Sequence, residues 1–249
     1  MTRMLSFVVL AALQARAATV ATVGDSLADA IYLGLKLQPD LLRKSDIKLV
    51  RWSRPSIGLT RVDQFDYTTW LRDTPDLGNV DFCVVEMGAN DLQSIATGNQ
   101  NARKWIAVGT EAWQRAYTDR VQALVETLKP QRCASVVWLL QPPYQKNKYL
   151  REYHGMINAV QSAGAASGTA MFEIDAGVDD YSADGVHFNK DFCFKLARAV
   201  ATLLASWRPP SAGTNCASCH ASPGLPTASL PDLAPLIPRP AHPSAVQTR

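Results

Sequence analysis

The chain has 249 residues, 47% of them hydrophobic and 19% charged, which suits one ordinary globular domain with a full core. Its formal net charge of +3 is close to neutral, and its lysines and arginines are dispersed along the chain. Because a nucleic-acid-binding protein normally presents a clustered basic face, this balance argues against a nucleic-acid partner.

The first residues have the pattern of an export signal. Arg3 supplies a positive charge, residues 4–13 are apolar, and residues 15–17 form an Ala-x-Ala-like cleavage site. The apolar stretch is too short to span a bilayer, which needs about twenty residues. We therefore expect a signal peptide over residues 1–17 and a periplasmic or secreted protein without a stable membrane span. The alternative is a buried first strand or helix of a cytosolic protein.

Apolar, strand-like runs alternate with longer helical patterns between residues 18 and 207, which we expect to form the main domain. The strand-like runs cover residues 19–23, 47–52, 82–87, 135–140 and 170–175. The helical patterns cover residues 26–38, 105–128, 148–166 and 191–207. Strands that are apolar on both faces and separated by helices predict a parallel sheet covered on two sides. The expected fold is therefore a doubly wound α/β sandwich of about five strands.

The composition changes beyond Trp207. Residues 208–249 are rich in proline, serine and alanine without sustained periodicity, which predicts a disordered tail. Within it, Cys216, Cys219 and His220 form the string CASCH, a pattern typical of c-type haem attachment. The alternatives are a local disulfide or reduced cysteines. We expect no cofactor, because this tail offers little apolar chain to enclose a haem and no methionine to ligate its iron.

Several other residues have structural explanations that we prefer to functional ones. Buried free thiols are expected for Cys83, Cys133 and Cys193, each of which lies in or beside an apolar run. His154 lies on an expected helix and is interpreted as a partly buried polar residue. Glu86 interrupts an apolar strand and needs a buried partner, which the pattern does not identify.

The same preference applies to three tryptophans and to two residues after Asn90. Core packing is expected for Trp70, Trp105 and Trp113, and a sugar-stacking surface is the alternative. Asp91 and Gln93 follow a candidate site residue, where they can touch substrate, or Asp91 can anchor its loop by hydrogen bonds. No Gly-rich phosphate loop is present, and no cluster in the main domain has metal-ligand spacing.

Four polar clusters follow the expected strands. They are GDS at 24–26, SIG at 56–58, GAND at 88–91 and DGVH at 184–187. Because ligands sit at the carboxyl ends of strands in such folds, all four clusters should lie at one edge of the sheet. Each cluster can also be a simple turn or helix cap. That alternative does not explain a histidine so soon after an aspartate, directly before the last helix.

Together these residues supply what acyl transfer needs. Ser26 is a candidate nucleophile, His187 is the base that would activate it, and Asp184 is the acceptor that would orient the imidazole. A tetrahedral intermediate also needs hydrogen-bond donors aimed at its oxyanion. The backbone N–H groups of Ser26 and Gly58 and the side-chain amide of Asn90 are candidates for this role.

In this order the four blocks resemble those of the SGNH superfamily of GDSL-type esterases and lipases, over residues 19–204. The resemblance implies a three-layer α/β/α sandwich. It also implies Ser26 as nucleophile, Asp184 and His187 as the other triad members, and Gly58 and Asn90 as oxyanion donors.

The strings SIGLTRVDQFDY, GANDLQS and WLLQPPY resemble, more narrowly, an exported and poorly characterised bacterial branch of that superfamily, with substrates generally unassigned. The nucleophile block, GDSLADAIY, departs from the GDSLTxG-type string of many superfamily enzymes. This departure affects the helix after Ser26 and therefore part of the expected acyl pocket.

The expected function is a periplasmic serine esterase that removes O-acyl groups from a carbohydrate or lipid through an acyl-enzyme. The partner is then a small-molecule or glycan ester. An O-acyltransferase is the near alternative, because the same machinery passes an acyl group to a sugar hydroxyl when water is excluded. A non-catalytic binding protein on the same fold is the alternative of a different class.

Overall fold

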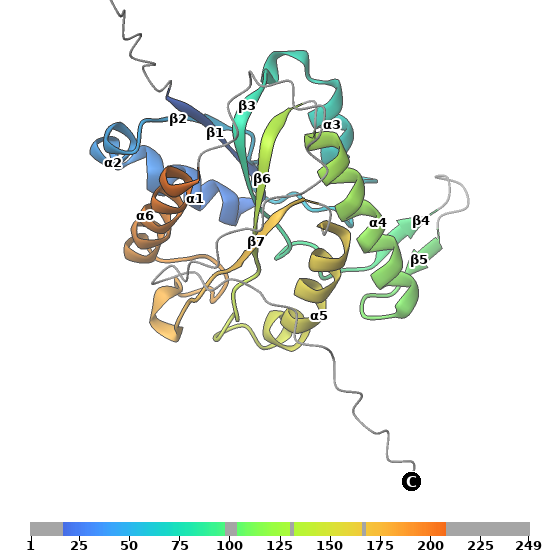
Figure 1. Cartoon of the computed structure of the whole chain (residues 1–249). Coiled ribbons are helices and arrows are strands. Elements are labelled where there is room, and N and C mark those ends of the chain that lie inside the picture. The colour runs from blue at the N-terminus through green and yellow to red at the C-terminus, as the bar shows by residue number, and fades with distance from the viewer. Residues whose placement is uncertain (1–16, 98–103, 130–131, 166–167, 208–249) are drawn as a thin grey trace, which may run out of the picture.

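The computed structural model describes residues 17–97, 104–129, 132–165 and 168–207, and in them a five-stranded sheet lies between two layers of helices (Figure 1). The strands are β1 (Ala18–Gly24), β2 (Ile47–Arg51), β3 (Val80–Glu86), β6 (Cys133–Leu140) and β7 (Ala170–Glu173). They pair in parallel in the order β2-β1-β3-β6-β7. The predicted α/β/α sandwich with a parallel sheet is confirmed.

The helices divide between the two faces of this sheet (Figure 1). On one face α1 (Ser26–Lys36) packs against α6 (Lys190–Ser206). On the other, α4 (Glu111–Leu128) packs against α5 (Lys148–Ala165) and α3 (Tyr67–Asp73). The shorter elements are α2 (Pro39–Lys44) and two 3-10 turns, Pro75–Leu77 and Val178–Asp180.

The central strands explain why the sequence reads as continuous apolar runs. β1 is buried from Val20 to Gly24, and every residue of β3 except Asp81 is buried. A strand covered by helices on both faces cannot alternate apolar and polar side chains, because both faces lie in the core. β2, at the edge of the sheet, has a mixed pattern of buried and exposed residues.

The prediction of one helix over residues 105–128 was wrong in its first part. β5 (Lys104–Ile106) pairs antiparallel with β4 (Ile95–Thr97), and α4 begins only at Glu111. Gly109 has φ +83°, a left-handed conformation that separates the strand from the helix. Thr110 then caps the helix by accepting a hydrogen bond from a backbone N–H in its first turn.

The prediction of free thiols was wrong for two of the three cysteines of the main domain. A disulfide joins Cys83 of β3 to Cys133 of β6, and these two strands are neighbours in the sheet. The two cysteines are 50 residues apart in sequence, so the linear pattern did not reveal that their strands are adjacent. Cys193 is free, as expected, but only half-buried.

The expected signal peptide lies, apart from Ala17, outside the described residues, and so does the tail with its CASCH string. Both stay predictions. Among the described residues, no helix combines the length and apolar character that a membrane crossing requires. In that same part of the chain, no three His, Cys, Asp or Glu side chains are grouped so that they could hold a metal ion.

The end of β1 lies unusually close to the end of β3. Gly24 has φ +133°, and a Cβ at this position would overlap the carbonyl oxygen of Glu86. It would also lie 3.2 Å from the Cβ of Ala28. Only glycine permits this approach, which sets the corner from which Ser26 and α1 begin.

We therefore expect Gly24→Ala to lower the free energy of unfolding by about 3 kcal/mol or more, from combined backbone strain and overlap. Gly155→Ala is the matched control, because no atom lies within 4 Å of a Cβ built at this position on α5. That change should raise the free energy of unfolding by about 0.5–1 kcal/mol. Urea denaturation measures both variants. Equal effects would mean that the close approach at Gly24 does not constrain the fold.

Candidate active site

Ser26 occupies the turn between β1 and α1, where it is the first residue of the helix. Asp25 caps that helix, and its Oδ1 accepts a hydrogen bond of 2.9 Å from the backbone N–H of Leu27. Because a helix N-terminus carries a partial positive charge, this position favours the development of negative charge beside the serine. The candidate nucleophile is therefore held at the carboxyl end of a central strand.

Ser26, His187 and Asp184 form one hydrogen-bonded chain. Ser26 Oγ lies 2.9 Å from His187 Nε2, and His187 Nδ1 lies 2.7 Å from Asp184 Oδ2. The serine and the histidine are 161 residues apart in sequence. Folding thus brings together the three side chains for which the sequence predicted nucleophile, base and orienting acid.

The loop that presents His187 is organised by Asp184 itself. One carboxylate oxygen, Oδ1, accepts hydrogen bonds from the backbone N–H groups of Val186 (2.9 Å) and His187 (3.0 Å). The other oxygen is left for the imidazole. The side chains of His187 and Asp184 remain 47% and 50% exposed, so water has access to the triad.

Two opposing effects act on the pKa of Asp184. Burial acts to raise it, but the hydrogen bonds from the His187 side chain and from the backbone N–H groups of Val186 and His187 outweigh burial and lower the pKa to about 2. Asp184 is therefore a carboxylate across the neutral range. A carboxylate in this place stabilises the imidazolium that forms when the histidine takes a proton.

The predicted oxyanion donors gather on the loops beside Ser26. The Asn90 side-chain amide donates to Asp25 Oδ2, with Nδ2 at 3.4 Å, which ties Asn90 to the residue before the nucleophile. Gly58 lies against the loop that carries Asn90, because a Cβ on Gly58 would overlap Asp91 Oδ1 and lie 3.5 Å from the Asn90 carbonyl carbon. Within the described residues, neither the Ser26 nor the Gly58 backbone N–H donates to a protein acceptor.

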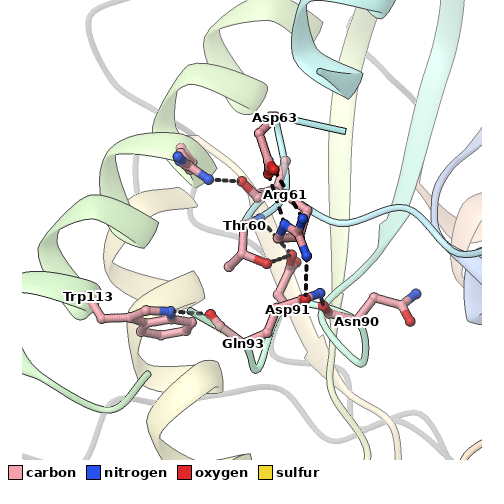
Figure 2. Close-up of polar contacts among 9 residues, drawn as sticks. Thr60, Arg61, Asp63, Asn90, Asp91, Gln93 and Trp113 are labelled. Carbon is pink, nitrogen blue, oxygen red and sulfur yellow. Dashed lines mark hydrogen bonds and ion pairs between the residues drawn. The ribbon is translucent and has the colours of Figure 1, made fainter. Parts of the chain in front are cut away.

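Asp91 connects the loop that carries Gly58 to the loop that carries Asn90 by hydrogen bonds (Figure 2). Its buried carboxylate accepts hydrogen bonds from the Thr60 backbone N–H at 2.9 Å and from the Tyr117 hydroxyl at 2.8 Å. Burial raises the pKa of Asp91, although these hydrogen bonds act in the opposite direction. Of the two expectations for Asp91, loop anchoring fits this buried position.

Gln93 has a similar role at the edge of the site. Its side-chain amide donates to the Asn90 carbonyl oxygen at 2.5 Å, and its Oε1 lies 3.4 Å from the Arg61 guanidinium (Figure 2). The guanidinium of Arg61 is also paired with the Asp63 carboxylate at 2.8 Å. The loop carrying Asn90 is therefore held from two sides.

Sequence reasoning missed residues that support the nucleophile turn. The Tyr67 hydroxyl accepts a hydrogen bond from the Gly24 N–H at 3.1 Å and donates to the Trp52 carbonyl oxygen at 2.7 Å. The partner of Glu86 is Gln141, whose Nε2 donates to Glu86 Oε1 at 2.8 Å. No local pattern signals either contact, because the partners come from separate elements.

His154 and the three tryptophans for which the sequence left a functional alternative differ in how far they are buried. His154 Nε2 lies 2.8 Å from the Gln141 carbonyl oxygen, which fits a partly buried structural residue. Trp113 is buried and donates to the Gln93 carbonyl oxygen, and Trp70 is half-buried against the core. Trp105 is 51% exposed, so the expectation of core packing was wrong for this residue.

The chain is similar to solved structures at low sequence identity. The chain is similar to a protein from Parabacteroides merdae that is assigned as a GDSL-like lipase, with 13% identity over 76% of this chain and 97% of that one and a TM-score of 0.50. LAE5, an α/β hydrolase from the metagenome of Lake Arreo, is 15% identical over 77% and 96% of the two chains, with a TM-score of 0.49. A protein from Slackia heliotrinireducens, assigned as an SGNH hydrolase, is 20% identical over 77% and 98%, with a TM-score of 0.46. At 13% identity the likeness to the Parabacteroides merdae protein concerns the fold alone.

Sequence comparison gives the family. No curated protein matches the chain in sequence. The model of the family described as "Protein of unknown function (DUF459)" matches residues 19–192, which contain all four sequence blocks. The chain therefore belongs to this family, DUF459, and its described residues have the SGNH/GDSL hydrolase fold that the four blocks predicted.

Proposed function

We propose that this protein is a serine esterase that hydrolyses O-acyl groups of a carbohydrate or lipid through an acyl-enzyme. The observation that carries the proposal is the hydrogen-bonded chain of Ser26, His187 and Asp184, with heavy-atom distances of 2.9 and 2.7 Å. A nucleophile within hydrogen-bond reach of a base that is itself oriented by a third group is the arrangement that covalent acyl transfer needs.

The proposed reaction has two halves. His187 Nε2 takes the proton of Ser26 Oγ as this oxygen attacks the ester carbonyl carbon, and Asp184 stabilises the resulting imidazolium. The Ser26 and Gly58 N–H groups and the Asn90 amide donate to the oxyanion of the tetrahedral intermediate. The imidazolium then protonates the leaving alkoxide, and the alcohol departs to leave the acyl-enzyme. Water, deprotonated by His187, attacks the acyl carbon, and the acid is released with Ser26 restored.

Exposure of the triad supports hydrolysis over acyl transfer to a sugar. About half of the His187 and Asp184 side-chain surface is accessible, so water can reach an acyl-enzyme at Ser26. An O-acyltransferase would need to exclude that water while it binds an acceptor hydroxyl. A periplasmic or secreted location, with a small-molecule or glycan ester as substrate, remains part of the proposal and rests on the sequence pattern.

The triad gives the first test. Ser26→Ala or His187→Ala should abolish hydrolysis of a short-chain p-nitrophenyl ester, because nucleophile and base act as a unit. Asp184→Asn should lower kcat by about 10⁴-fold, and Asn90→Ala by about 10²–10³-fold. Labelling by a fluorophosphonate should be lost in Ser26→Ala. It should persist in the control Ser162→Ala, whose hydroxyl donates to a backbone carbonyl of α5. Wild-type protein that stays unlabelled beside an active esterase would support the binding-protein alternative.

The pH dependence gives the second test. Asp184, with its pKa lowered to about 2, stays ionised over the range of the assay, so it contributes no change in rate there. Attack requires a neutral imidazole, so kcat/KM should rise with pH across about pH 6 to 7, where imidazole groups lose their proton. A flat profile from about pH 5 to 8, with chemistry rate-limiting, would exclude His187 as the base.

The tail gives a third test, because we propose that the esterase needs no cofactor. Protein expressed with the c-type maturation machinery should show no Soret absorption band. Truncation after Pro209 should leave ester hydrolysis unchanged. A covalently bound haem on Cys216, Cys219 and His220 would instead make this a protein with two functions.

A further inference from the structure

Two carboxyl groups are buried together beneath the nucleophile turn. Asp25 and Glu86 are both fully buried, and no ion pair to a lysine or arginine satisfies either of them in the described part of the chain. They come together because Gly24 and Glu86 are register partners of β1 and β3. The Asp25 N–H also donates to the Glu86 carbonyl oxygen at 3.3 Å. Two carboxylates placed this close cannot both be ionised without a large energetic cost.

The hydrogen-bond donors are divided unequally between the two groups. Asp25 accepts from the Leu27 N–H at 2.9 Å, the Gly88 N–H at 3.2 Å and the Asn90 amide at 3.4 Å. Glu86 Oε1 accepts from Gln141 Nε2, but within the described residues Oε2 has no donor. An ionised Glu86 would thus leave a buried carboxylate oxygen unsatisfied, which is costly. A protonated Glu86 removes that deficit, because Oε2 then carries a hydrogen that Asp25 can accept.

We propose that Asp25 and Glu86 share one proton at neutral pH, which Glu86 carries and donates in a hydrogen bond to Asp25. The Asp25 carboxylate, kept ionised in this way, positions Asn90 for the oxyanion. Asp25 and Glu86 are then positioning residues that act through Asn90. The role of Asn90 rests on the proposed esterase function, whereas the shared proton does not.

The surroundings agree with a proton held in this pair. Burial, and then the charge of Asp25, raises the pKa of Glu86 well above its ordinary value, although the Gln141 amide and the Ala28 backbone N–H act in the opposite direction. Burial likewise raises the pKa of Asp25, to about 7, against the effect of its backbone hydrogen bonds. The other titratable groups whose charges act on the pair are Asp91, His187, Tyr67, Tyr117, Tyr144 and Tyr181. Burial raises the pKa of all four tyrosines, so they stay neutral across the neutral range.

The geometry explains how the pair acts on the site. An asparagine amide carries two hydrogens on Nδ2. When Asp25 accepts one of them, the side chain is fixed and the other hydrogen remains for the oxyanion. The same carboxylate oxygen also accepts the Gly88 N–H, so it fixes the start of the loop that carries Asn90. If Asp25 were protonated at Oδ2, this oxygen would accept hydrogen bonds from Gly88 and Asn90 less well.

The shared proton is tested by the pH dependence of stability. Unfolded Asp and Glu lose their protons near pH 4, whereas the folded pair keeps one, so the folded chain binds more protons and stability falls as pH rises. Glu86→Gln supplies an amide donor to Asp25 without this proton. The folding equilibrium constant of Glu86→Gln relative to wild type should therefore rise by up to about tenfold per pH unit between about pH 6 and 8, the limit for one proton. Asp91 and His187 are present in both the wild type and the variant, so their contributions to the pH dependence of stability cancel in the ratio.

Parallel stability curves would overturn the shared proton. If Glu86→Gln does not fold, the carboxyl ¹³C chemical shift of Glu86 in the wild-type protein decides the question. The shift of a protonated carboxyl group at pH 7 supports the proposal, and the shift of a carboxylate refutes it. Neither measurement needs turnover.

Positioning is tested by a double-mutant cycle. Asp25→Asn should lower kcat by about 10²–10³-fold, as loss of an oxyanion donor does, with little change in KM. Combined with Asn90→Ala it should cost no more than Asn90→Ala alone, because both changes remove the same donor. Asp29→Asn is the control on the same helix. Its carboxylate pairs with Arg51 at 2.6 Å, so this change should leave kcat unaltered.

Additive losses from Asp25→Asn and Asn90→Ala would refute the positioning role while leaving the esterase intact. If hydrolysis survives Ser26→Ala, the proposed function itself fails and the role of Asn90 fails with it. The stability measurements would still report on the proton shared by Asp25 and Glu86.

Discussion

The contact between the ends of β1 and β3 is the constraint on which the site depends. Gly24, without a side chain, lets its strand approach the Glu86 carbonyl oxygen in register. The loops that leave these two strands then begin next to each other. One carries Ser26 and the other carries Asn90, so a single backbone approach sets the proposed nucleophile beside the proposed donor for its oxyanion.

Two aspartates near the nucleophile differ because their environments differ. Asp184 lies on an exposed loop, where hydrogen bonds from His187 and the backbone outweigh burial and lower its pKa to about 2. Asp25 is buried beside Glu86, and burial raises its pKa to about 7. Neighbouring carboxyl groups with separated pKa values take different roles in a reaction site. In the proposed esterase the exposed acid would orient the base, and we assign the buried one to the oxyanion side.

The strands and the four polar blocks were predictable because their signals are local. β1 and β3 are covered on both faces, so each reads as an uninterrupted apolar run. Helical periodicity likewise located α5 and α6. The same kind of reading failed over residues 105–128, where the short strand β5 and the helix α4 share one apolar pattern until the left-handed turn at Gly109 separates them.

The amino-acid order established which residue types stand at the strand ends, and hence a serine, a histidine, an aspartate and an asparagine suited to acyl transfer. Contacts between distant segments were not accessible in this way. The 2.9 Å contact of Ser26 with His187, the Cys83–Cys133 disulfide and the burial of Glu86 beside Asp25 all depend on which strands are neighbours. Periodicity reports how a segment packs against the core, whereas the pairing of segments follows from the packing of the whole chain.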